Sequence, residues 1–136
     1  MIYECTISHR MIDKNGNEKS VRQTYLVENK ELFGEVESTA YEALGGLVDF
    51  DVIAIKRSKL REIINSRDND DEFLFVADVA DVQTNDDGEE VELVYKVALF
   101  ALSMDDAYEK TKAYLNQGFD MSIVGIKKTR LEEVLV

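Results

Sequence analysis

The sequence contains one cysteine, one histidine, no proline and no tryptophan among its 136 residues. A single cysteine, Cys5, cannot form an internal disulfide, and structural zinc sites need several Cys or His ligands. Acid–base and nucleophile-activating roles most often rely on histidine, and His9 stands alone. No apolar run approaches the roughly 20 residues that cross a bilayer. These absences argue against a zinc site, a histidine-based enzyme and a membrane protein, and we expect no cofactor and no metal; the missing proline and tryptophan exclude nothing.

Acidic residues outnumber basic ones by 28 to 16, which gives a net charge of −12. A field of this sign repels nucleic acid and anionic membranes at long range, and it favours solubility or a basic partner. Mimicry of nucleic acid by an acidic face stays open as an alternative. The first residues, Met1 to Cys5, lack the basic region and apolar core of a signal peptide, so we expect a cytoplasmic protein in a bacterial host cell.

The chain repeats itself. The segment from Ile55 to Ile64 matches the segment from Ile126 to Leu135 position by position, with Arg61 against Glu132 as the clear exception. The same offset continues backwards through both halves, and one more residue of offset brings Gly16 onto Gly88. Internal repeats of this kind indicate two copies of one supersecondary unit.

Each copy predicts the same order of elements. A strand with period-two alternation comes first, then a polar Asn-Gly or Asp-Gly turn typical of hairpins, and then a return strand. Helical spacing follows, from Phe33 to Leu47 in the first copy and after Ser103 in the second, where Ser103 and Asp106 resemble a capping box. Gly45-Gly46 and Gly118 are expected to end these helices. A third strand comes next, 52–56 or 123–127, and a short helical turn begun by Ser58 or Thr129 closes each copy.

We therefore predict an α+β protein formed by tandem duplication of a β-β-α-β unit. The expected boundaries are residues 1–64 for the first repeat, 65–72 for a polar linker and 73–136 for the second repeat, in one compact domain overall. A unit of about 65 residues buries little core alone, so we expect the copies to pair about a pseudo-twofold axis. The expected result is a continuous antiparallel or mixed sheet with the helices on one side.

The chain resembles an uncharacterised small-protein family of Bacteroidetes and their phages, a domain of unknown function. The residues that carry the resemblance are Tyr3-Glu4-Cys5, Tyr25-Leu26-Val27, Phe33-Gly34-Glu35-Val36-Glu37 and Ile55-Lys56-Arg57. Val36 replaces the alanine usual in the family, and the second half is unusually basic near Lys127. The resemblance implies this fold and a bacterial or phage setting, and it supplies no catalytic residues.

Basic residues concentrate in the two matched segments and form the candidate ligand-binding set: Lys56, Arg57, Lys59, Arg61, Lys127, Lys128 and Arg130. If the copies are related by a twofold axis, these clusters are related by it as well, and they make a positive patch for phosphate groups or an acidic partner. The alternative is that they are solvated residues at strand ends that pair weakly with nearby glutamates. Exposed tyrosines such as Tyr25, Tyr41 and Tyr108 could stack on bases, but in strands and helices they more often pack.

The remaining candidates favour structural roles. We expect His9 to be a partly exposed strand residue and Cys5 to be a small buried hydrophobe on the same strand. The acidic runs 68–72 and 85–90 lack the ligand spacing of a calcium loop and are expected to be solvated turns. No Gly-rich phosphate loop or Ser/His/Asp arrangement is present, so no catalytic residues are assigned.

The sequence favours a non-enzymatic binding or interaction protein, such as a phage or mobile-element accessory factor. We expect a protein partner or a homo-oligomer, with an anionic ligand or nucleic acid also considered and no membrane. The alternative is a nucleotide or nucleic-acid binder that uses the paired basic segments. A carboxylate enzyme with a metal and a structural particle component are further hypotheses.

Overall fold

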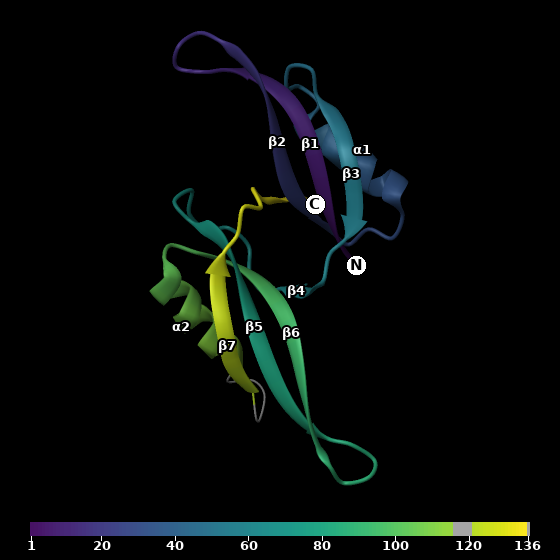
Figure 1. Cartoon of the computed structure of the whole chain (residues 1–136), viewed down its shortest axis with the longest axis vertical. Helices are drawn as coiled ribbons and strands as arrows, with labels where there is room; N and C mark the ends of the chain where they lie inside the picture. The colour runs from purple at the N-terminus through teal and green to yellow at the C-terminus, as the bar shows by residue number, and fades with distance from the viewer. Residues whose placement is uncertain (116–120, 136) are drawn as a thin grey trace. The chain divides into compact units, whose positions relative to one another are not determined.

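The computed structural model of the protein describes residues 1–115 and 121–135. They form two compact units, one built from Met1–Ser58 with Arg130–Val136 and the other from Lys59–Thr129. Each unit is a four-stranded mixed sheet with one helix against it (Figure 1). The predicted α+β class is confirmed, but the described strands form two sheets instead of one continuous sheet.

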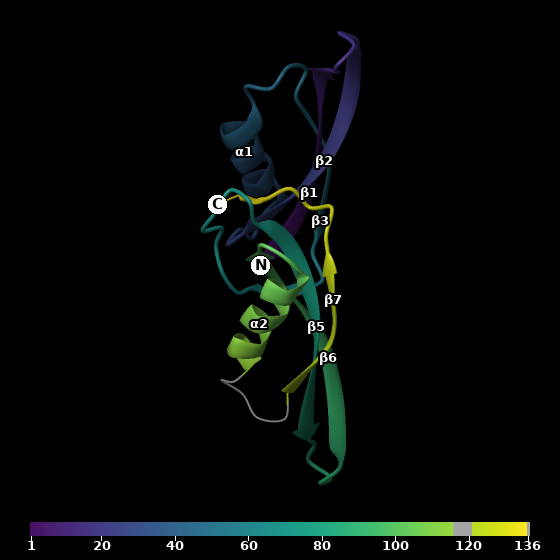
Figure 2. The same cartoon turned by 90° about the vertical axis from the view of Figure 1, so that its left-hand side faces the viewer.

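The first unit contains β1 (Ile2–Ile12), β2 (Glu18–Glu28), α1 (Phe33–Leu44), β3 (Asp51–Arg57) and the short strand β8 (Val134–Leu135). Its strand order is β3-β1-β2-β8, with β8 parallel to β2 and the other pairs antiparallel. Helix α1 covers one face of this sheet (Figure 2).

The second unit contains β4 (Leu60–Ile63), β5 (Phe73–Thr84), β6 (Glu90–Ala101), α2 (Met104–Leu115) and β7 (Met121–Lys128). Its strand order is β4-β6-β5-β7, with β4 parallel to β6 and the other pairs antiparallel. Read from the opposite edge, this order matches that of the first unit. The predicted capping serine is present: the Asp106 amide donates to Ser103 Oγ at 3.1 Å, while the Asp106 carboxylate accepts from the Leu102 amide. Gly118, predicted to end this helix, lies outside the described residues.

The hairpin turns of the two units are built alike. The amide of Gly16 donates to the carbonyl of Asp13 at 3.1 Å, and the amide of Gly88 donates to the carbonyl of Asn85 at 3.0 Å. In each turn the side chain of the first residue accepts two backbone N–H groups. Both glycines have φ of 80°, a left-handed conformation that costs glycine little. The predicted Gly-containing hairpins are confirmed.

A β-bulge also occupies the same place in both units. The pairing of β1 with β3 shifts between Thr6 and Ile7, and the pairing of β5 with β7 shifts between Asp78 and Val79. The amides of Ser58 and Thr129, which follow these third strands, donate at 2.9 Å to the carbonyls of Ile2 in β1 and Leu74 in β5. The two units therefore agree in strand register and in these hydrogen bonds, in the way that the predicted duplication requires.

The cores lie between each helix and its sheet, and equivalent positions fill them. In the first unit Tyr3, Cys5, Ile7, Tyr25, Val27, Val36 and Ala40 are buried together. In the second unit the core is Phe75, Ala77, Val79, Val97, Leu99, Ala101, Ala107 and Leu115. The alternation read from the first strand is buried at Tyr3, Cys5 and Ile7. Of the helical stripe predicted from Phe33 to Leu47, Val36 and Ala40 are buried, whereas Phe33 and Leu47 themselves are exposed.

The closing segments differ from the prediction. Ser58 and Thr129 begin no helical turn; the residues after them form the strands β4 and β8, so that prediction is wrong. Each strand extends the sheet of the other repeat: the Ile64 amide donates to the Ala98 carbonyl, and the Leu26 amide donates to the Glu133 carbonyl, both at 2.9 Å. The two repeats thus exchange their last segments, because an open strand edge satisfies more backbone groups than an isolated turn would.

The glycine conformations predict opposite effects for two alanine substitutions. Gly88→Ala places a side chain at φ of 80° and should destabilise the protein by about 1 kcal/mol. Gly34→Ala lies in α1, where an added methyl group meets nothing within 4 Å, and should stabilise it by about 0.5–1 kcal/mol. Urea unfolding of the two variants measures both changes; a stabilising Gly88→Ala would contradict the assigned turn.

Candidate interaction surface

The outer part of each hairpin has only two strands. Strand β7 pairs with β5 as far as Asp81, so residues 82–84 of β5 pair with β6 alone. In the first unit β3 pairs with β1 only from Tyr3 to Ser8, so β2 is the only described strand that pairs with residues 9–12, although the Arg10 amide also donates to the Val48 carbonyl at 2.8 Å. A two-stranded ribbon has little core of its own and is marginally stable in isolation. Residues 81–94 are called the acidic arm below, and residues 9–22 the basic arm.

The acidic arm combines exposed apolar side chains with carboxylates. Four of its aliphatic side chains are exposed, namely Val82, Val91, Leu93 and Val94, and Val94 has 58% of its surface exposed to solvent. Six of its residues are acidic and none is lysine or arginine: Asp81, Asp86, Asp87, Glu89, Glu90 and Glu92. Within residues 1–115 and 121–135, none of these carboxylates lies in an ion pair. Exposed apolar groups beside uncompensated charge are typical of an interaction surface.

The basic arm has the same backbone and the opposite charge. It carries four cations, Arg10, Lys14, Lys19 and Arg22, and two carboxylates, Asp13 and Glu18. Its exposed apolar residues are Met11 and Ile12, the latter with 68% of its surface open to solvent. Arg10 is held by Asp49 at 3.1 Å and by Glu18 at 3.3 Å. The two arms therefore have the same turn geometry but opposite net charge.

Sequence reasoning missed these arms. The prediction that the run 85–90 is a solvated turn agrees with the exposure of those residues. The exposure of the strand residues on either side of the turn was not predicted. Two signals were present in the sequence. No lysine or arginine occurs between residues 79 and 95, and when the two copies are aligned, Lys14 corresponds to Asp86.

The basic set predicted from the sequence is distributed over sheet edges. Lys56 and Arg57 end β3, and Lys127 and Lys128 end β7; these strands stand at one edge of the first and the second sheet. In the second unit Arg61 lies on β4, at the opposite edge from β7. The predicted twofold relation between the clusters stays a prediction.

The contacts of these cations are local. Lys56 lies 3.8 Å from Glu4, Lys128 lies 3.5 Å from the centroid of the Phe73 ring, and Arg61 lies 4.3 Å from that of Tyr95. Lys59 precedes β4 and Arg130 follows β7, and both are exposed. Lysine on an edge strand discourages edge-to-edge pairing with other chains, and a bulge acts in the same direction. The placement fits the solvated, edge-protecting interpretation of these residues.

The single histidine and cysteine are both buried. His9 keeps 7% of its surface and its Nε2 lies 2.9 Å from Gln23 Oε1, so the expectation of a partly exposed residue is wrong: the strand alternation continues into the packed face. Cys5 is fully buried, as expected, and burial raises the pKa of its thiol above the ordinary value. A protonated, buried thiol is a poor nucleophile.

The predicted linker 65–72 is bound to the second unit. Asn65 donates to the Phe100 carbonyl at 2.9 Å and accepts from the Phe100 amide at 2.7 Å. The run is the expected exposed turn from Asp68 to Asp71, but Glu72 at its end is only 4% exposed. Its carboxylate accepts from Lys110 Nζ at 2.7 Å and from the amides of Asp68 and Asn69. These bonds, the one from Lys110 above all, lower the pKa of Glu72.

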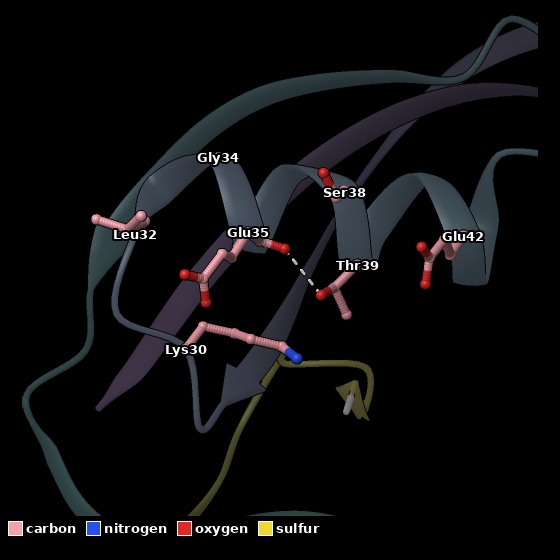
Figure 3. A pocket seen from close by; sticks show the side chains of 7 residues that line it. All are labelled: Lys30, Leu32, Gly34, Glu35, Ser38, Thr39 and Glu42. Atoms are coloured by element: carbon pink, nitrogen blue, oxygen red, sulfur yellow. Dashed lines mark hydrogen bonds between the residues drawn. The ribbon is translucent and has the colours of Figure 1, made fainter.

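A shallow groove of about 530 Å³ runs beside α1. It is lined by Lys30, Leu32, Gly34, Glu35, Ser38, Thr39 and Glu42. Lys30 extends below the helix, and Thr39 Oγ1 donates to the Glu35 carbonyl at 2.8 Å (Figure 3). The lining mixes one cation with two carboxylates, which gives no preference for a ligand of either charge.

Of the tyrosines considered for base stacking, one is buried and two are exposed. Tyr25 is buried in the core of the first unit. Tyr41 is 47% exposed and packs edge-on against Phe50, with ring centroids 5.0 Å apart. Tyr108 is 45% exposed.

In the described part of the chain, no group of three or more His, Cys, Asp or Glu side chains is placed to hold a metal ion. No helix of residues 1–115 or 121–135 is long and apolar enough to cross a membrane.

Comparison with known proteins places the chain in a family. No curated protein and no solved structure matches the chain. A family model covers the whole of it, residues 1–136, which agrees with the resemblance seen in the strand and helix motifs. The chain belongs to the family described as Domain of unknown function (DUF4494).

Proposed function

We propose that the protein is a non-enzymatic binding protein whose acidic arm holds a basic protein partner. The observation that supports this proposal is the exposure of Val82 and Val94 on the same arm as carboxylates that have no ion pair among the described residues. The phage or mobile-element setting belongs to the same proposal and rests on the family resemblance alone.

The register of the arm explains how a partner would be recognised. Val82 pairs with Glu92, Thr84 pairs with Glu90 and Ala80 pairs with Val94, so these side chains share one face of the ribbon. A cationic, amphipathic segment laid on this face would cover the valines and neutralise the glutamates at once. Apolar burial supplies affinity of about 25 cal/mol per Å², and the charges supply selectivity and a fast encounter.

We do not extend the proposal to nucleic acid. The acidic arm repels phosphate, and the basic set lies on several sheet edges, where Lys128 and Arg61 already contact aromatic rings. A nucleic-acid site usually gathers its cations and aromatic side chains on one surface.

A peptide-binding experiment tests the proposal. The probe is a synthetic peptide that alternates lysine and valine, measured by fluorescence anisotropy at low and high salt. The wild-type protein should bind it, and the variant Glu90→Gln/Glu92→Gln/Val94→Ser should bind roughly tenfold more weakly, because two charges and one apolar contact are lost. High salt should weaken wild-type binding.

The matched control changes the same residue types elsewhere. Glu37→Gln/Glu109→Gln/Val48→Ser alters two exposed helical carboxylates and one exposed valine. This control should bind the peptide as the wild type does. Equal binding by the arm variant and the wild type would overturn the proposal.

A further inference from the structure

The two arms are complementary to each other. At equivalent positions of the repeat, Lys14 stands where the acidic arm has Asp86, and Asn17 stands where it has Glu89. The backbone is the same at both places, since each turn closes with the same hydrogen bonds and the same glycine conformation. The difference between the arms therefore lies in their side chains.

The complementarity includes one defined face. On the face of the ribbon that bears Ser8, the basic arm presents Arg10, Ile12, Glu18 and Arg22, because Arg22 pairs with Ser8, Arg10 with Ser20 and Ile12 with Glu18. The equivalent positions of the acidic arm are Val82, Thr84 and Val94, and Glu90 and Glu92 complete that face. This face of the basic arm thus has two arginines and one glutamate around an isoleucine, and that of the acidic arm has two glutamates beside two valines.

Most cations of the basic arm lie in no ion pair of the described residues. Arg10 has two carboxylate partners within its own unit. Lys14, Lys19 and Arg22 lie in no ion pair of residues 1–115 and 121–135, and all three are exposed. On a chain of net charge −12, these side chains form a local positive surface that is drawn to an acidic one.

We propose that the basic partner of the acidic arm is the basic arm of a second copy of this chain. The inference rests on the proposed function and names its partner. Each copy carries one arm of each sign, so the contact is heterologous: one copy gives its acidic arm, and the next gives its basic arm. Such contacts add copies head to tail and produce closed rings or open chains. A contact of this small size is weak and sensitive to salt.

Charge reversal with mixing tests the inference. In the first variant, Lys14→Glu/Arg22→Glu, both arms are acidic. In the second, Asp86→Lys/Asp87→Lys/Glu89→Lys/Glu92→Lys, the net charge of the acidic arm changes from −6 to +2, which equals that of the basic arm. The measurement is the mass distribution by sedimentation velocity at low salt, over a range of protein concentrations. The wild type should associate with rising concentration, and each variant alone should associate roughly tenfold more weakly, since like charges then face each other.

An equimolar mixture of the two variants should regain association, because one supplies two acidic arms and the other a cationic arm in place of the acidic one. The control Lys112→Glu/Glu109→Lys exchanges two exposed charges on α2 and should associate as the wild type does. Circular dichroism spectra of all variants show whether each is folded.

The outcomes separate this inference from the proposed function. A wild type that stays monomeric at every salt and concentration overturns self-association, while binding of the lysine–valine peptide would still support a basic partner of another kind. Association that survives either charge reversal, or that is not regained on mixing, also overturns the inference. Failure of the wild-type protein to bind the peptide, or equal binding by the wild type and the arm variant, would overturn the proposed function itself.

Discussion

Removal of residues 130–136 is expected to destabilise the unit built from residues 1–58 by about 2–4 kcal/mol. These last residues contribute the strand β8, whose Leu135 packs against the core of the first unit. They also accept and donate backbone hydrogen bonds: Leu26 donates to the Glu133 carbonyl at 2.9 Å, and Glu132 donates to the Thr24 carbonyl at 2.8 Å. The loss combines one partly buried leucine with backbone groups left unpaired.

Hydrogen exchange read by mass spectrometry or NMR localises this effect. The amide of Leu26 should exchange much faster in the truncated chain, because its acceptor is gone. The amide of Ile64 is the internal control, since it donates to the Ala98 carbonyl within the second unit. A milder variant, Leu135→Ala, keeps the backbone and should show a smaller change in the same direction. Equal protection of Leu26 with and without residues 130–136 would contradict the strand exchange.

The comparison of sequence and structure shows why the hairpins were predictable and the closing strands were not. The turns at Gly16 and Gly88 carry a local signal, because only glycine adopts φ of 80° without strain. The strand β8 has two residues, too few to display a period of two. Its conformation is decided by an open edge on β2, more than a hundred residues earlier in the chain. Local sequence patterns carry no information about a strand partner that far away in the chain.

The candidate interaction surface could not be predicted from the sequence for a related reason. Apolar residues occur along the whole of β6, from Val91 to Ala101, but their burial depends on whether a helix or a third strand lies alongside. Val97 and Leu99 are buried under α2, whereas Leu93 and Val94 are exposed because β5 alone pairs with that part of β6. The basic segments, by contrast, were visible in the sequence, and the structure gives them edge positions.

The ion pair of Glu72 and Lys110 is the second large effect that we expect. Lys110→Met should destabilise the protein by roughly 3 kcal/mol, because it leaves the Glu72 carboxylate 4% exposed and without its cation. Glu72→Gln should cost less, since Lys110 retains Asp106 at 3.4 Å and keeps part of its surface in water. The control is Glu18→Gln, which removes an exposed partner of Arg10 and should change the free energy of unfolding by less than about 1 kcal/mol.

The pH dependence of this pair has a definite sign. The hydrogen bond from Lys110 lowers the pKa of Glu72 below its ordinary value of 4.5, and the bond to Glu72 raises the pKa of Lys110 above 10.5. A lowered carboxyl pKa gives stability that is fully present above pH 4.5 and is lost as the pH falls through the folded-state pKa. The raised lysine pKa gives stability that is present below pH 10.5 and is lost at higher pH. Urea unfolding of wild type and Lys110→Met should therefore differ most between these limits and converge in acid, because protonated Glu72 no longer needs a cation. A difference that stays constant down to strong acid would show that Lys110 stabilises the unit by packing instead of by charge.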